Sequence, residues 1–587
     1  MKPFSQNIIA NRIQCHAIHN PEGEIAVYGD RRIIWRELCV RVYKLANMLI
    51  SEGVSPGDKV AFMFHNCPEF IEVNYAVQVA GAIPVPVNYR FSASEITYQI
   101  NHCDARIFFF ESAFNPAVEQ AAHDLSGIGK FICKGDTLVA EAVAYETFLS
   151  SGSADDPQIP TDWSDVAVMI YTGGTTGFPK GVMLTYQGHL DMFCNLVAAI
   201  ATRLADVNLS KDQMQHITHL VSVPGLGFLS GLINTKLGKK ILRSKKTYKS
   251  VEKAIRYLFM HPESAGKIHK TTLRFMTPSM PYFHDASYQA LMLCAFAGNI
   301  CPVMIPGITF NPEAILKAVE AERPLVMANV PTGWKKLVSF EGFDNYDVSS
   351  LLAAATGAGV CPADLKQKIF DRFPGVVVID VFGQTEMTPI TTFRIDTSPE
   401  TIKERSVGKS ILDARVVDEK GKDVRQGDVG EIMYRSSWVM QGYYKDEEET
   451  EASLKDGWFK SGDLGYIDKD GEIRLVDRKK ECINTGGEKV FPLEVEEVLH
   501  HHPHVEEVCV IGVPDEEWGH AIRAVVQPVS GADPDPEEIR AFCRGKLAGY
   551  KIPRSVVFVD ELPLSPVGKV LRSKIRELYG QPATKMT

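Results

Sequence analysis

The N-terminal part of the chain alternates between helical and strand-like patterns of apolar positions. Residues 35–53 repeat apolar side chains at helical spacing and end at a glycine, and a short apolar run follows at 60–64. Residues 68–88 read as a helix, a glycine and a strand, 105–110 as a buried strand, and an apolar run beginning at Val166 leads into a glycine-rich loop. Strands alternating with helices predict an α/β fold with largely parallel sheets, whose ligands bind beyond the carboxyl ends of the strands.

The rest of the chain indicates two domains. The alternation is interrupted between Thr185 and Pro278 and then resumes. After the glycine-rich, charged stretch 476–492, roughly 110 residues carry an apolar β-α-β pattern of their own, which is long enough for a small domain. We therefore predict an α/β protein with a large N-terminal domain of parallel-sheet α/β subdomains, 1–477, and a small α+β C-terminal domain, 478–587.

Composition and charge narrow the classes of function. The chain of 587 residues is 45% hydrophobic and 23% charged, with a formal net charge of -10. This acidic balance argues against nucleic acid as a partner, because binding a phosphate backbone needs a basic surface. No signal-type N-terminus and no apolar run of 18 residues is present, so we expect a cytoplasmic protein without a spanning segment. The twelve cysteines form no CxxC pair and no spacing typical of a zinc site, which is consistent with reduced thiols.

The loop YTGGTTGFPKG, residues 171–181, has the composition of a phosphate-binding turn. Backbone N–H groups of glycines can approach phosphate oxygens closely, and threonine hydroxyls add donors. A Walker A loop places its lysine directly after a glycine and before a hydroxyl residue. Lys180 instead follows Pro179 and precedes Gly181. The loop therefore predicts a nucleotide site that differs from that of phosphate-loop ATPases and kinases.

The longer motif YTGGTTGFPKGVMLT resembles the signature loop of the adenylate-forming superfamily, which comprises acyl-CoA synthetases, luciferases and peptide-synthetase adenylation domains. Further motifs, VFGQTE, SGDLGYID, DRKKE and LPLSPVGKVLR, follow in the order of that family, and the resemblance extends over most of the chain. It implies an AMP-forming carboxylate–CoA ligase. The acid attacks the α-phosphorus of ATP, and coenzyme A then takes the acyl group from the acyl-adenylate. The implied cofactors are ATP, Mg²⁺ and coenzyme A, and the implied partner is a small-molecule carboxylic acid.

The resemblance assigns nucleotide contacts in the large domain. The loop threonines would hold the leaving diphosphate. Glu386 would hold Mg²⁺, since hard cations prefer carboxylate oxygens, and Thr385 would lie near the α-phosphate. The turn ATGAGV would form one wall of the adenine pocket, with Gly359 where the family usually has proline. The nucleotide-binding residues implied here are Thr172, Gly173, Gly174, Thr175, Thr176, Gly177, Lys180, Gly357, Ala358 and Gly383.

In the C-terminal region the resemblance implies a ribose site, a hinge and a catalytic lysine. Asp463 would receive the two ribose hydroxyls, because a carboxylate accepts two hydrogen bonds at once, and Arg478 would lie on the same side. Lys480 occupies the hinge position. Lys569 would bridge the substrate carboxylate and the α-phosphate, and rotation of the small, mobile domain would then withdraw it.

The thiol-transfer step is also implied by resemblance. Gly486 and Gly487 would let the pantetheine arm of coenzyme A pass close to the backbone after the rotation. His284, in the segment TPSMPYFHDAS, would gate the thiol tunnel or help to deprotonate the thiol, because the usual imidazole pKa lies near 6.5. A merely structural aromatic–histidine cluster is the alternative. The histidines of 500–504 are expected at a solvated helix end, since no acidic or cysteine metal ligand lies at a suitable spacing.

An atypical basic insert, about 205–270, departs from the family pattern. Its part from Lys236 to Lys270 holds eleven lysines and arginines against two glutamates. The insert is either a solvated excursion without catalytic duty or a contact for an anionic partner: a membrane surface, a carrier protein or a neighbouring subunit. Whether the protein is a homodimer stays open.

The acid is predicted only by class. Tyr282, Phe283 and methionines near the motifs favour a compact apolar acid, either aromatic or alicyclic or a short-to-medium-chain fatty acid, in a reaction that metabolite levels could reverse. An adenylating ligase that passes the acyl group to a carrier protein is the main alternative.

Overall fold

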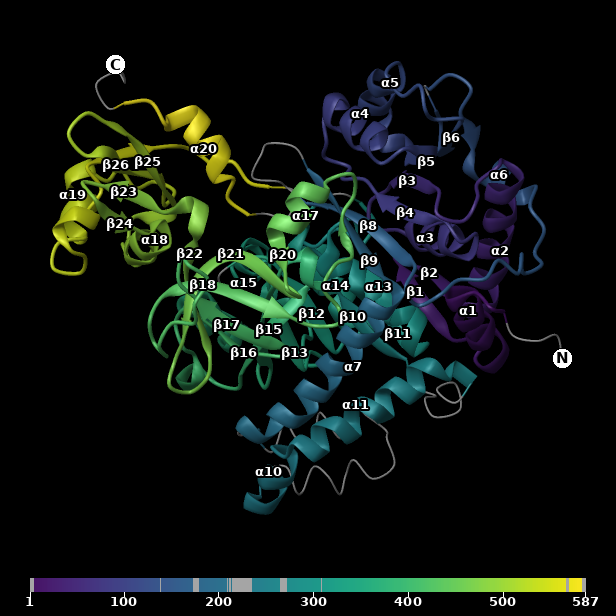
Figure 1. Ribbon diagram of the computed structural model, residues 1–587, viewed down its shortest axis with the longest axis horizontal. Helices are drawn as coiled ribbons and strands as arrows, with labels where there is room; N and C mark the ends of the chain where they lie inside the picture. Colours follow the sequence, from purple (N-terminus) through teal and green to yellow (C-terminus); the bar gives the residue numbers. More distant parts are fainter. Residues whose placement is uncertain are drawn as a thin grey trace. The chain divides into compact units, whose positions relative to one another are not determined.

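A computed structural model gives the fold of the chain (Figure 1). The described residues are 5–137, 139–172, 179–207, 209–210, 213, 235–263, 272–307, 309–359, 361–565 and 569–582. The chain forms two compact units, one of residues 1–404 with 436–454 and one of residues 405–435 with 455–587. The first is α/β with parallel sheets and the C-terminal part of the second is a small α+β fold, which confirms the predicted fold class. The domain boundary at Arg478 stays a prediction.

The first unit contains a five-stranded parallel sheet in the order β4-β3-β5-β6-β7. Its strands are β3 (Lys59–Met63), β4 (Ile83–Pro86), β5 (Ala105–Glu111), β6 (Lys130–Lys134) and β7 (Val143–Ala144). Helices α4 (Ala93–His102) and α5 (Asn115–Ala122) pack their apolar stripes against it, with Ile96 and Val118 among the fully buried side chains. Ser92 and Glu95 form a capping box that starts α4.

A second sheet of the same unit runs in the order β15-β14-β13-β12-β10-β11-β1-β2. The strands from β14 to β1 run parallel to one another, whereas β15 is antiparallel to β14 and β2 is antiparallel to β1. The strands are β1 (Glu24–Tyr28), β2 (Arg31–Ile34), β10 (Leu273–Met276), β11 (Ile300–Met304), β12 (Val326–Asn329), β13 (Ala353–Thr356), β14 (Val377–Gly383) and β15 (Ile390–Asp396).

Helices α14 (Pro312–Glu322), α15 (Pro331–Val338) and α16 (Ala363–Arg372) share one core with this sheet. Leu316, Trp334 and Ile369 are the buried anchors of the three helices. Pro312 and Pro331 start two of them, where the missing backbone N–H of proline costs no hydrogen bond.

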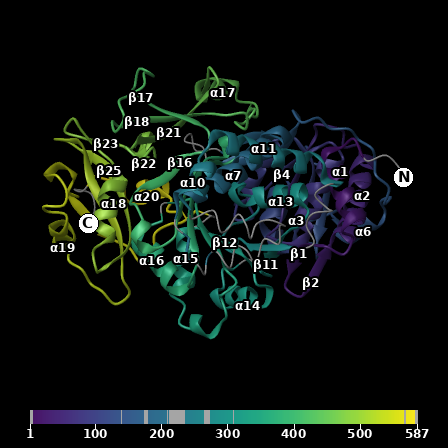
Figure 2. The same cartoon turned by 90° about the horizontal axis from the view of Figure 1, so that it is seen from below.

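Two helices, α3 (Pro68–Val79) and α13 (Asp285–Ala297), form a buried layer in the first unit (Figure 2). Every residue of α3 is buried, which excludes a solvent-facing side. The hydroxyl of Tyr75 donates to the carbonyl of Leu291 at 2.5 Å, and that of Tyr288 donates to Asn74 at 2.7 Å. Polar contacts therefore fix the register of the two helices inside an apolar layer. Other helices of this unit are α1 (Ile8–His19), α2 (Trp35–Ser51) and α6 (Tyr145–Ser150).

A small antiparallel sheet, β19-β9-β8, carries the base of the glycine-rich loop. Its strands are β8 (Val166–Thr172), β9 (Lys180–Thr185) and β19 (Gly442–Tyr443). Helix α7 (Tyr186–Arg203) follows β9, and Thr185 caps it by accepting from the backbone N–H of Gly188 at 3.0 Å.

The described part of the basic insert is helical. It contains α10 (Lys236–Leu242) and α11 (Lys245–Met260), and α11 lies along α7 (Figure 1). Tyr248 donates to the side chain of Asn195 at 2.8 Å, and Arg256 forms an ion pair of 2.6 Å with Asp191. The most apolar stretch of the insert, residues 220–233, lies outside the described residues.

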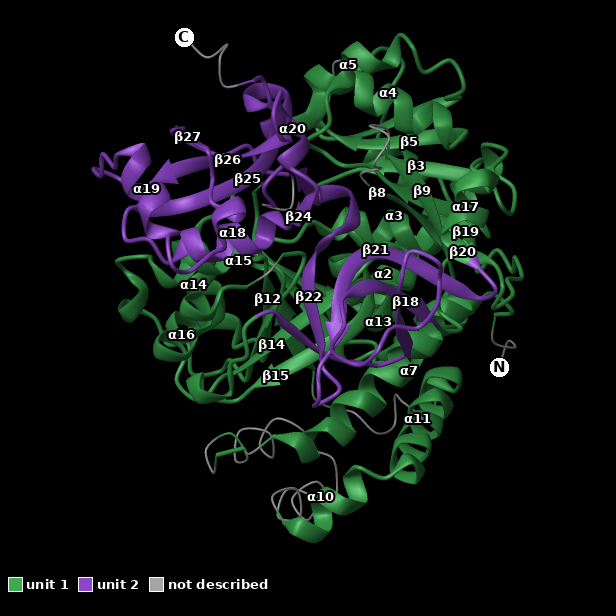
Figure 3. Cartoon of the chain, turned by 60° about the vertical axis from the view of Figure 1, so that its left-hand side comes forward, with its two compact units in different colours: residues 1–404, 436–454 green, residues 405–435, 455–587 purple. Residues whose placement is uncertain are grey.

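The second unit, purple in Figure 3, begins with an antiparallel sheet in the order β17-β18-β21-β22-β16. Its strands are β16 (Ser406–Ser410), β17 (Asp413–Val417), β18 (Gly430–Arg435), β21 (Trp458–Ile467) and β22 (Ile473–Arg478), with β20 (Leu454–Lys455) beside β21. In the first unit, α17 (Glu447–Ser453) precedes β20.

The C-terminal part of the second unit has its own core. The hairpin β23 (Ile483–Thr485)–β24 (Glu488–Val490) precedes a sheet of β25 (Val505–Asp515), β26 (Gly519–Pro528) and β27 (Ser555–Phe558). Helices α18 (Pro492–His500), α19 (Pro536–Phe542) and α20 (Arg572–Tyr579) contribute buried residues such as Leu499, Ile539 and Ile575 to the core. Within the described ranges, no helix combines the length and apolar character needed to cross a bilayer.

Candidate active site

Thr172 and Lys180 face each other where β8 ends and β9 begins, so they form the base of the glycine-rich loop. Gly173, Gly174, Thr175, Thr176 and Gly177 lie outside the described residues. The ammonium of Lys180 lies 3.1 Å from a carboxylate oxygen of Glu449 and 5.2 Å from the ring centre of Tyr443. The lysine is therefore held by a carboxylate and an aromatic face at the start of its strand.

Glu386 follows the end of β14 and is fixed from two sides. Its Oε1 accepts a hydrogen bond of 2.8 Å from the hydroxyl of Tyr443, and its backbone carbonyl accepts one of 2.8 Å from the N–H of Met440. Burial and the charge of Glu386 raise the pKa of Tyr443 far above its usual value, so the tyrosine stays a donor. Thr385 begins the single 3-10 turn that carries Glu386.

The residues implied for the adenine side lie at the carboxyl ends of neighbouring parallel strands. Thr356 on β13 is paired in register with Asp380 on β14. Gly357 and Ala358 follow β13, and Gly383 is the last residue of β14. A Cβ on Gly383 would lie 1.7 Å from the carbonyl oxygen of Pro389, so only glycine fits there. This edge is where an α/β sheet binds its ligands.

His284 is the residue before α13, and its neighbour Asp285 begins that helix. Asp285 is fully buried, and one carboxylate oxygen accepts from the side chain of Gln289 at 2.6 Å. Burial raises the pKa of Asp285 to about 8, while the Gln289 hydrogen bond opposes the rise and the charge of Glu386 adds to it. The residue is therefore mainly a neutral carboxylic acid at pH 7, a feature that motif reading did not indicate.

Asp463 and Arg478 are directly opposite each other on the antiparallel strands β21 and β22. The Nε of Arg478 lies 2.8 Å from Oδ1 of Asp463, and the carboxylate is buried. The backbone N–H of Asp463 also donates to the hydroxyl of Ser461 at 3.0 Å. Strand pairing thus explains why a carboxylate and a guanidinium fifteen positions apart meet, since both belong to one hairpin of strands.

Lys569 lies in the electrostatic field of Arg478, Asp463, Lys480 and Arg572. Solvent reaches its side chain, yet many protein atoms surround it. Burial lowers the pKa of Lys569 to about 8, the neighbouring cations lower it further and Asp463 opposes them. Burial also lowers the pKa of Lys480. The second unit therefore brings together the four residues that the motifs single out for the ribose, the hinge and the catalytic lysine.

Gly486 and Gly487 form the two-residue turn between β23 and β24. Their φ angles are +59° and +85°, the left-handed region that such tight hairpins require. A Cβ on Gly486 would lie 2.3 Å from the ring of Trp518, whereas one on Gly487 would meet nothing within 4 Å. Both glycines thus have a backbone reason to be present, and the passage of a thiol arm would be an additional role.

The carboxylate of Glu386 fits the Mg²⁺ ion that the motifs imply. Glu386 uses one carboxylate oxygen for Tyr443, and the other suits a hard cation such as Mg²⁺, which typically takes one or two protein carboxylates beside phosphate.

Tyr443, Asp285 and Glu449 were not foreseen from the sequence. No local signal could have found them, because each reaches the site through strand or helix packing.

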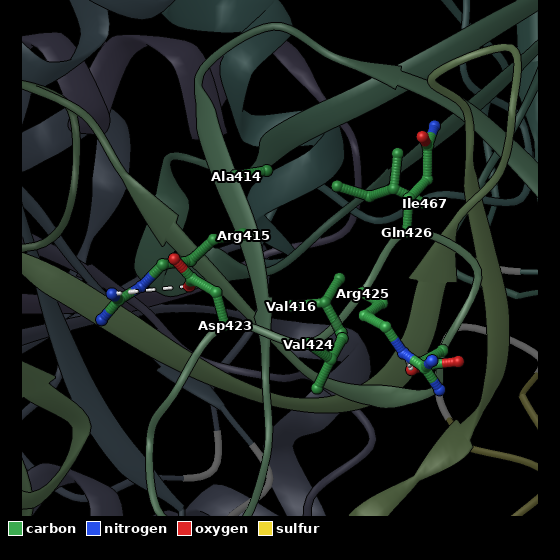
Figure 4. A pocket seen from close by; sticks show the side chains of 9 residues that line it. Ala414, Arg415, Val416, Asp423, Val424, Arg425, Gln426 and Ile467 are labelled. Carbon is green, nitrogen blue, oxygen red and sulfur yellow. Dashed lines mark hydrogen bonds and ion pairs between the residues drawn. The ribbon is translucent and has the colours of Figure 1, made fainter.

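A hollow of about 300 Å³ in the second unit is separate from these residues (Figure 4). It lies between β17 and the turn 423–428, and Figure 4 shows Arg415 and Asp423 paired at its edge, 3.7 Å apart. None of the predicted site residues lines it.

Two protein-family models match the chain. The model of the AMP-binding enzymes matches residues 14–252 and 247–444, and the model of the AMP-binding enzyme C-terminal domain matches residues 494–569.

Relatives of nearly the same length are similar over the whole chain. A feruloyl-CoA synthase of an Amycolatopsis species is 30% identical over 574 residues, covering 96% of this chain and 97% of the relative. An indoleacetate–CoA ligase of Aromatoleum aromaticum is 28% identical, covering 97% and 98%. The fold is similar to the crystal structure of an anthranilate CoA ligase with anthranoyl-AMP, with a TM-score of 0.77, 22% identity and coverage of 100% and 99%.

These matches confirm the resemblance to the adenylate-forming enzymes. They also confirm the predicted class, an AMP-forming acid–thiol ligase, for which ATP, Mg²⁺ and coenzyme A are the standard cofactors. The chain belongs to the AMP-binding enzymes.

Proposed function

We propose that this protein joins a compact apolar carboxylic acid to coenzyme A through an acyl-adenylate. The observation that carries the proposal is the gathering of Lys569, Asp463 and Arg478 in the second unit, in a chain whose two family matches span both ends. Coenzyme A is favoured over a carrier protein as the acceptor. The relatives named above are a CoA synthase and a CoA ligase, and their similarity to this chain extends over nearly their full length.

The acid is an aromatic or alicyclic carboxylate or a short-to-medium-chain fatty acid. Support comes from the buried ring of Tyr282 and from Phe283, whose ring stands edge-on to Tyr89 at 5.2 Å. Met387, next to Glu386, is also fully buried. The two relatives are named for feruloyl and indoleacetate groups, which are aromatic acids.

In the first half-reaction, the substrate carboxylate attacks the α-phosphorus of ATP and diphosphate leaves. Lys569 neutralises the charge shared by the attacking carboxylate and the α-phosphate, and Thr385 orients that phosphate. Glu386 would hold Mg²⁺, which would supply charge neutralisation at the phosphates. Thr172 and Lys180 hold the base of the diphosphate loop, and Asp463 and Arg478 take the ribose.

In the second half-reaction, the small domain 478–587 turns about Lys480 and the thiol attacks the acyl carbonyl, releasing AMP. The turn of Gly486 and Gly487 lines the path of the thiol, and His284 accepts its proton. A domain rotation of this kind lets one nucleotide site serve two reactions.

The test is a product assay on the purified full-length protein. Benzoate, cyclohexenecarboxylate, hexanoate, laurate and acetate are each offered with ATP and either coenzyme A or a carrier protein bearing the pantetheine arm. We expect AMP, diphosphate and an acyl-CoA with one of the apolar acids. ADP as the product, or acyl transfer to the carrier protein alone, would reject the proposal.

We further propose that α10 and α11 dock on an anionic membrane surface. Residues 236–260 hold nine lysines and arginines against one glutamate, in a chain of net charge -10. Leu237, Ile241, Tyr257 and Met260 are between 47% and 64% exposed, so apolar side chains lie beside the cations. Such a pairing favours an interface between headgroups and acyl chains. The twelve cysteines are free thiols, which favours a protein that lies in a reducing compartment such as the cytoplasm. The membrane surface proposed here would then be the one that faces that compartment.

A further inference from the structure

A cluster of metal-ligating side chains lies at the carboxyl edge of the five-stranded parallel sheet. The chain passes from β3 to β4 on one side and then to β5 on the other, so β3 lies at the point where the strand order reverses. His65 follows β3, Glu111 ends β5, and Cys67 is the residue before α3. The crevice beyond such a switch point is where α/β sheets bind ligands.

The three side chains already have the spacing of a coordination site. One ligand atom of each, His65 Nδ1, Cys67 Sγ and a Glu111 oxygen, lies within 4.8 Å of the others. His65 Nδ1 contacts Glu111 Oε2 directly. His65 is 5% exposed and Cys67 is 0% exposed, while Glu111 reaches the surface.

Neighbouring groups orient the ligands as they do in metal sites. The hydroxyl of Tyr28 lies 2.8 Å from His65 Nε2, so a proton on Nε2 can be donated to the tyrosine and leave the Nδ1 lone pair for a metal. Lys134 lies 3.4 Å from the other oxygen of Glu111 and 3.0 Å from Glu69. Its charge is thus balanced by Glu69 as well as by Glu111.

We propose that His65, Cys67 and Glu111 bind one zinc-class divalent ion. Imidazole, thiolate and carboxylate together are the donors that Zn²⁺ takes, whereas Mg²⁺ and Ca²⁺ prefer oxygen alone. The thiolate and the carboxylate neutralise the two charges of the ion. A fourth position is left for water. Sequence patterns did not indicate this site, because Glu111 is 46 residues away from His65.

The site would act on the segment that precedes the proposed acyl pocket. Asn66, between two of the ligands, donates from its side chain to the carbonyl of Met280 at 3.0 Å and accepts from the N–H of Tyr282 at 2.8 Å. If a metal fixes His65 and Cys67, it also fixes Asn66 between them, and with it the two hydrogen bonds that Asn66 makes to residues 280 and 282. Metal binding itself does not depend on the proposed reaction, so failure of one does not imply failure of the other.

A second cluster provides a useful contrast. This cluster consists of His502, His504 and Glu538, whose potential ligand atoms lie close together. The sequence indicated no acidic ligand near these histidines, because Glu538 belongs to the distant helix α19. Nδ1 of His502 accepts the backbone N–H of His504 at 3.1 Å. Nε2 must then carry the proton that faces Glu538, so it has no lone pair for a metal.

The experiment uses full-length protein stripped with a chelator and titrated with Co²⁺ and then Zn²⁺. We expect one thiolate-to-cobalt charge-transfer absorption per chain, bleached by Zn²⁺, and a higher melting temperature with Zn²⁺. Cys67→Ser should abolish the absorption. His65→Gln, which keeps the thiol, should weaken Zn²⁺ binding at least about 100-fold, since even loss of an outer-shell partner costs about 10–100-fold. Tyr28→Phe, which changes only such a partner, should weaken it about tenfold.

Cys133→Ser and His504→Ala are the matched controls. Cys133 is a buried cysteine on the neighbouring strand β6, and His504 belongs to the second cluster. Both should bind as the unaltered protein does. No thiolate absorption in the unaltered protein, its persistence in Cys67→Ser, or equal loss in Cys133→Ser would overturn the site.

Discussion

The hydroxyl of Tyr443 donates a hydrogen bond of 2.8 Å to Oε1 of Glu386. Tyr443 lies on β19, which is paired with β9, the strand that begins at Lys180. The strand that leaves the glycine-rich loop and the carboxylate proposed to hold Mg²⁺ are therefore connected through one short strand. A shift of β19 would disturb both at once.

Tyr443→Phe should weaken the use of Mg-ATP. A hydrogen bond to a charged group contributes about 1.5–3 kcal/mol, so we expect a loss of about 10–100-fold in kcat/KM for ATP. Diphosphate exchange into ATP measures the effect at several Mg²⁺ concentrations. Tyr444→Phe removes a hydroxyl bonded to Asp104 at the surface and should leave exchange unchanged. Equal effects of the two changes would argue against a specific role for Tyr443.

Lys569→Ala should separate the two half-reactions. Adenylate formation should fall about 10²–10³-fold, as it does when a charge-stabilising donor is removed from a reacting oxygen. Thioester formation from supplied acyl-AMP should be largely retained, because the lysine would be withdrawn in that step. Lys574→Ala, an exposed lysine of α20 paired with Glu577, is the control. Equal loss in both half-reactions would remove Lys569 from its proposed position.

The pH profile of adenylation should report the same lysine. The pKa of Lys569 is lowered to about 8, so its ammonium is present at pH 7 and is lost as the pH rises through 8. The adenylation rate should therefore fall above pH 8. Lys569→Arg carries a guanidinium that does not titrate in this range, so the alkaline fall should move to higher pH even if the maximal rate is lower. An unchanged alkaline limb in Lys569→Arg would contradict the assignment.

The turn of β23 and β24 allows a graded test of backbone conformation. Gly487→Ala should cost about 1–2 kcal/mol of stability, because its φ is +85°. Gly486→Ala should cost more, since its Cβ would also meet the ring of Trp518. Chemical denaturation of the full chain ranks the two. A larger cost at Gly487 would show that the turn differs from the one described.

Charge reversal on α11 should weaken vesicle binding. Lys246, Lys249 and Lys253 share the exposed face of the helix, and each basic residue near an anionic bilayer contributes about 1 kcal/mol. Changing all three to glutamate should therefore reduce binding to phosphatidylserine vesicles at least about 100-fold, and salt should weaken binding of the unaltered protein. Lys317, Lys336 and Lys368, exposed on α14, α15 and α16, provide a control triple change. Salt-insensitive binding, or no binding by the unaltered protein, would count against a membrane role.

Much of the fold could be predicted because its signals are local. The apolar run from Val166 leads directly from strand to loop, and Gly383 is the last residue of β14. The paired motifs around Asp463 and Arg478 are close enough in the chain to lie on adjacent strands. Sequence patterns of this length encode an element and the turn that follows it.

The missing parts of the site depend on packing between distant segments. Tyr443 is 57 residues from Glu386, and His65 is 46 residues from Glu111. The raised pKa of Asp285 follows from complete burial, and a single aspartate beside a histidine gives no indication of that burial. Such relationships exist only once the strands are ordered, so no spacing along the chain could have indicated them.

The crowding at Gly383 limits which substitutions could change the carboxylic acid that this enzyme accepts as its substrate. Its Cβ position is occupied by the carbonyl oxygen of Pro389, so any larger residue would displace the backbone beside Glu386. In a mutant library designed to change substrate range, substitutions of Gly383 would therefore destabilise the fold before they altered the pocket. Productive diversity would have to come from side chains such as Phe283 and Met387, where volume can be exchanged without moving the main chain.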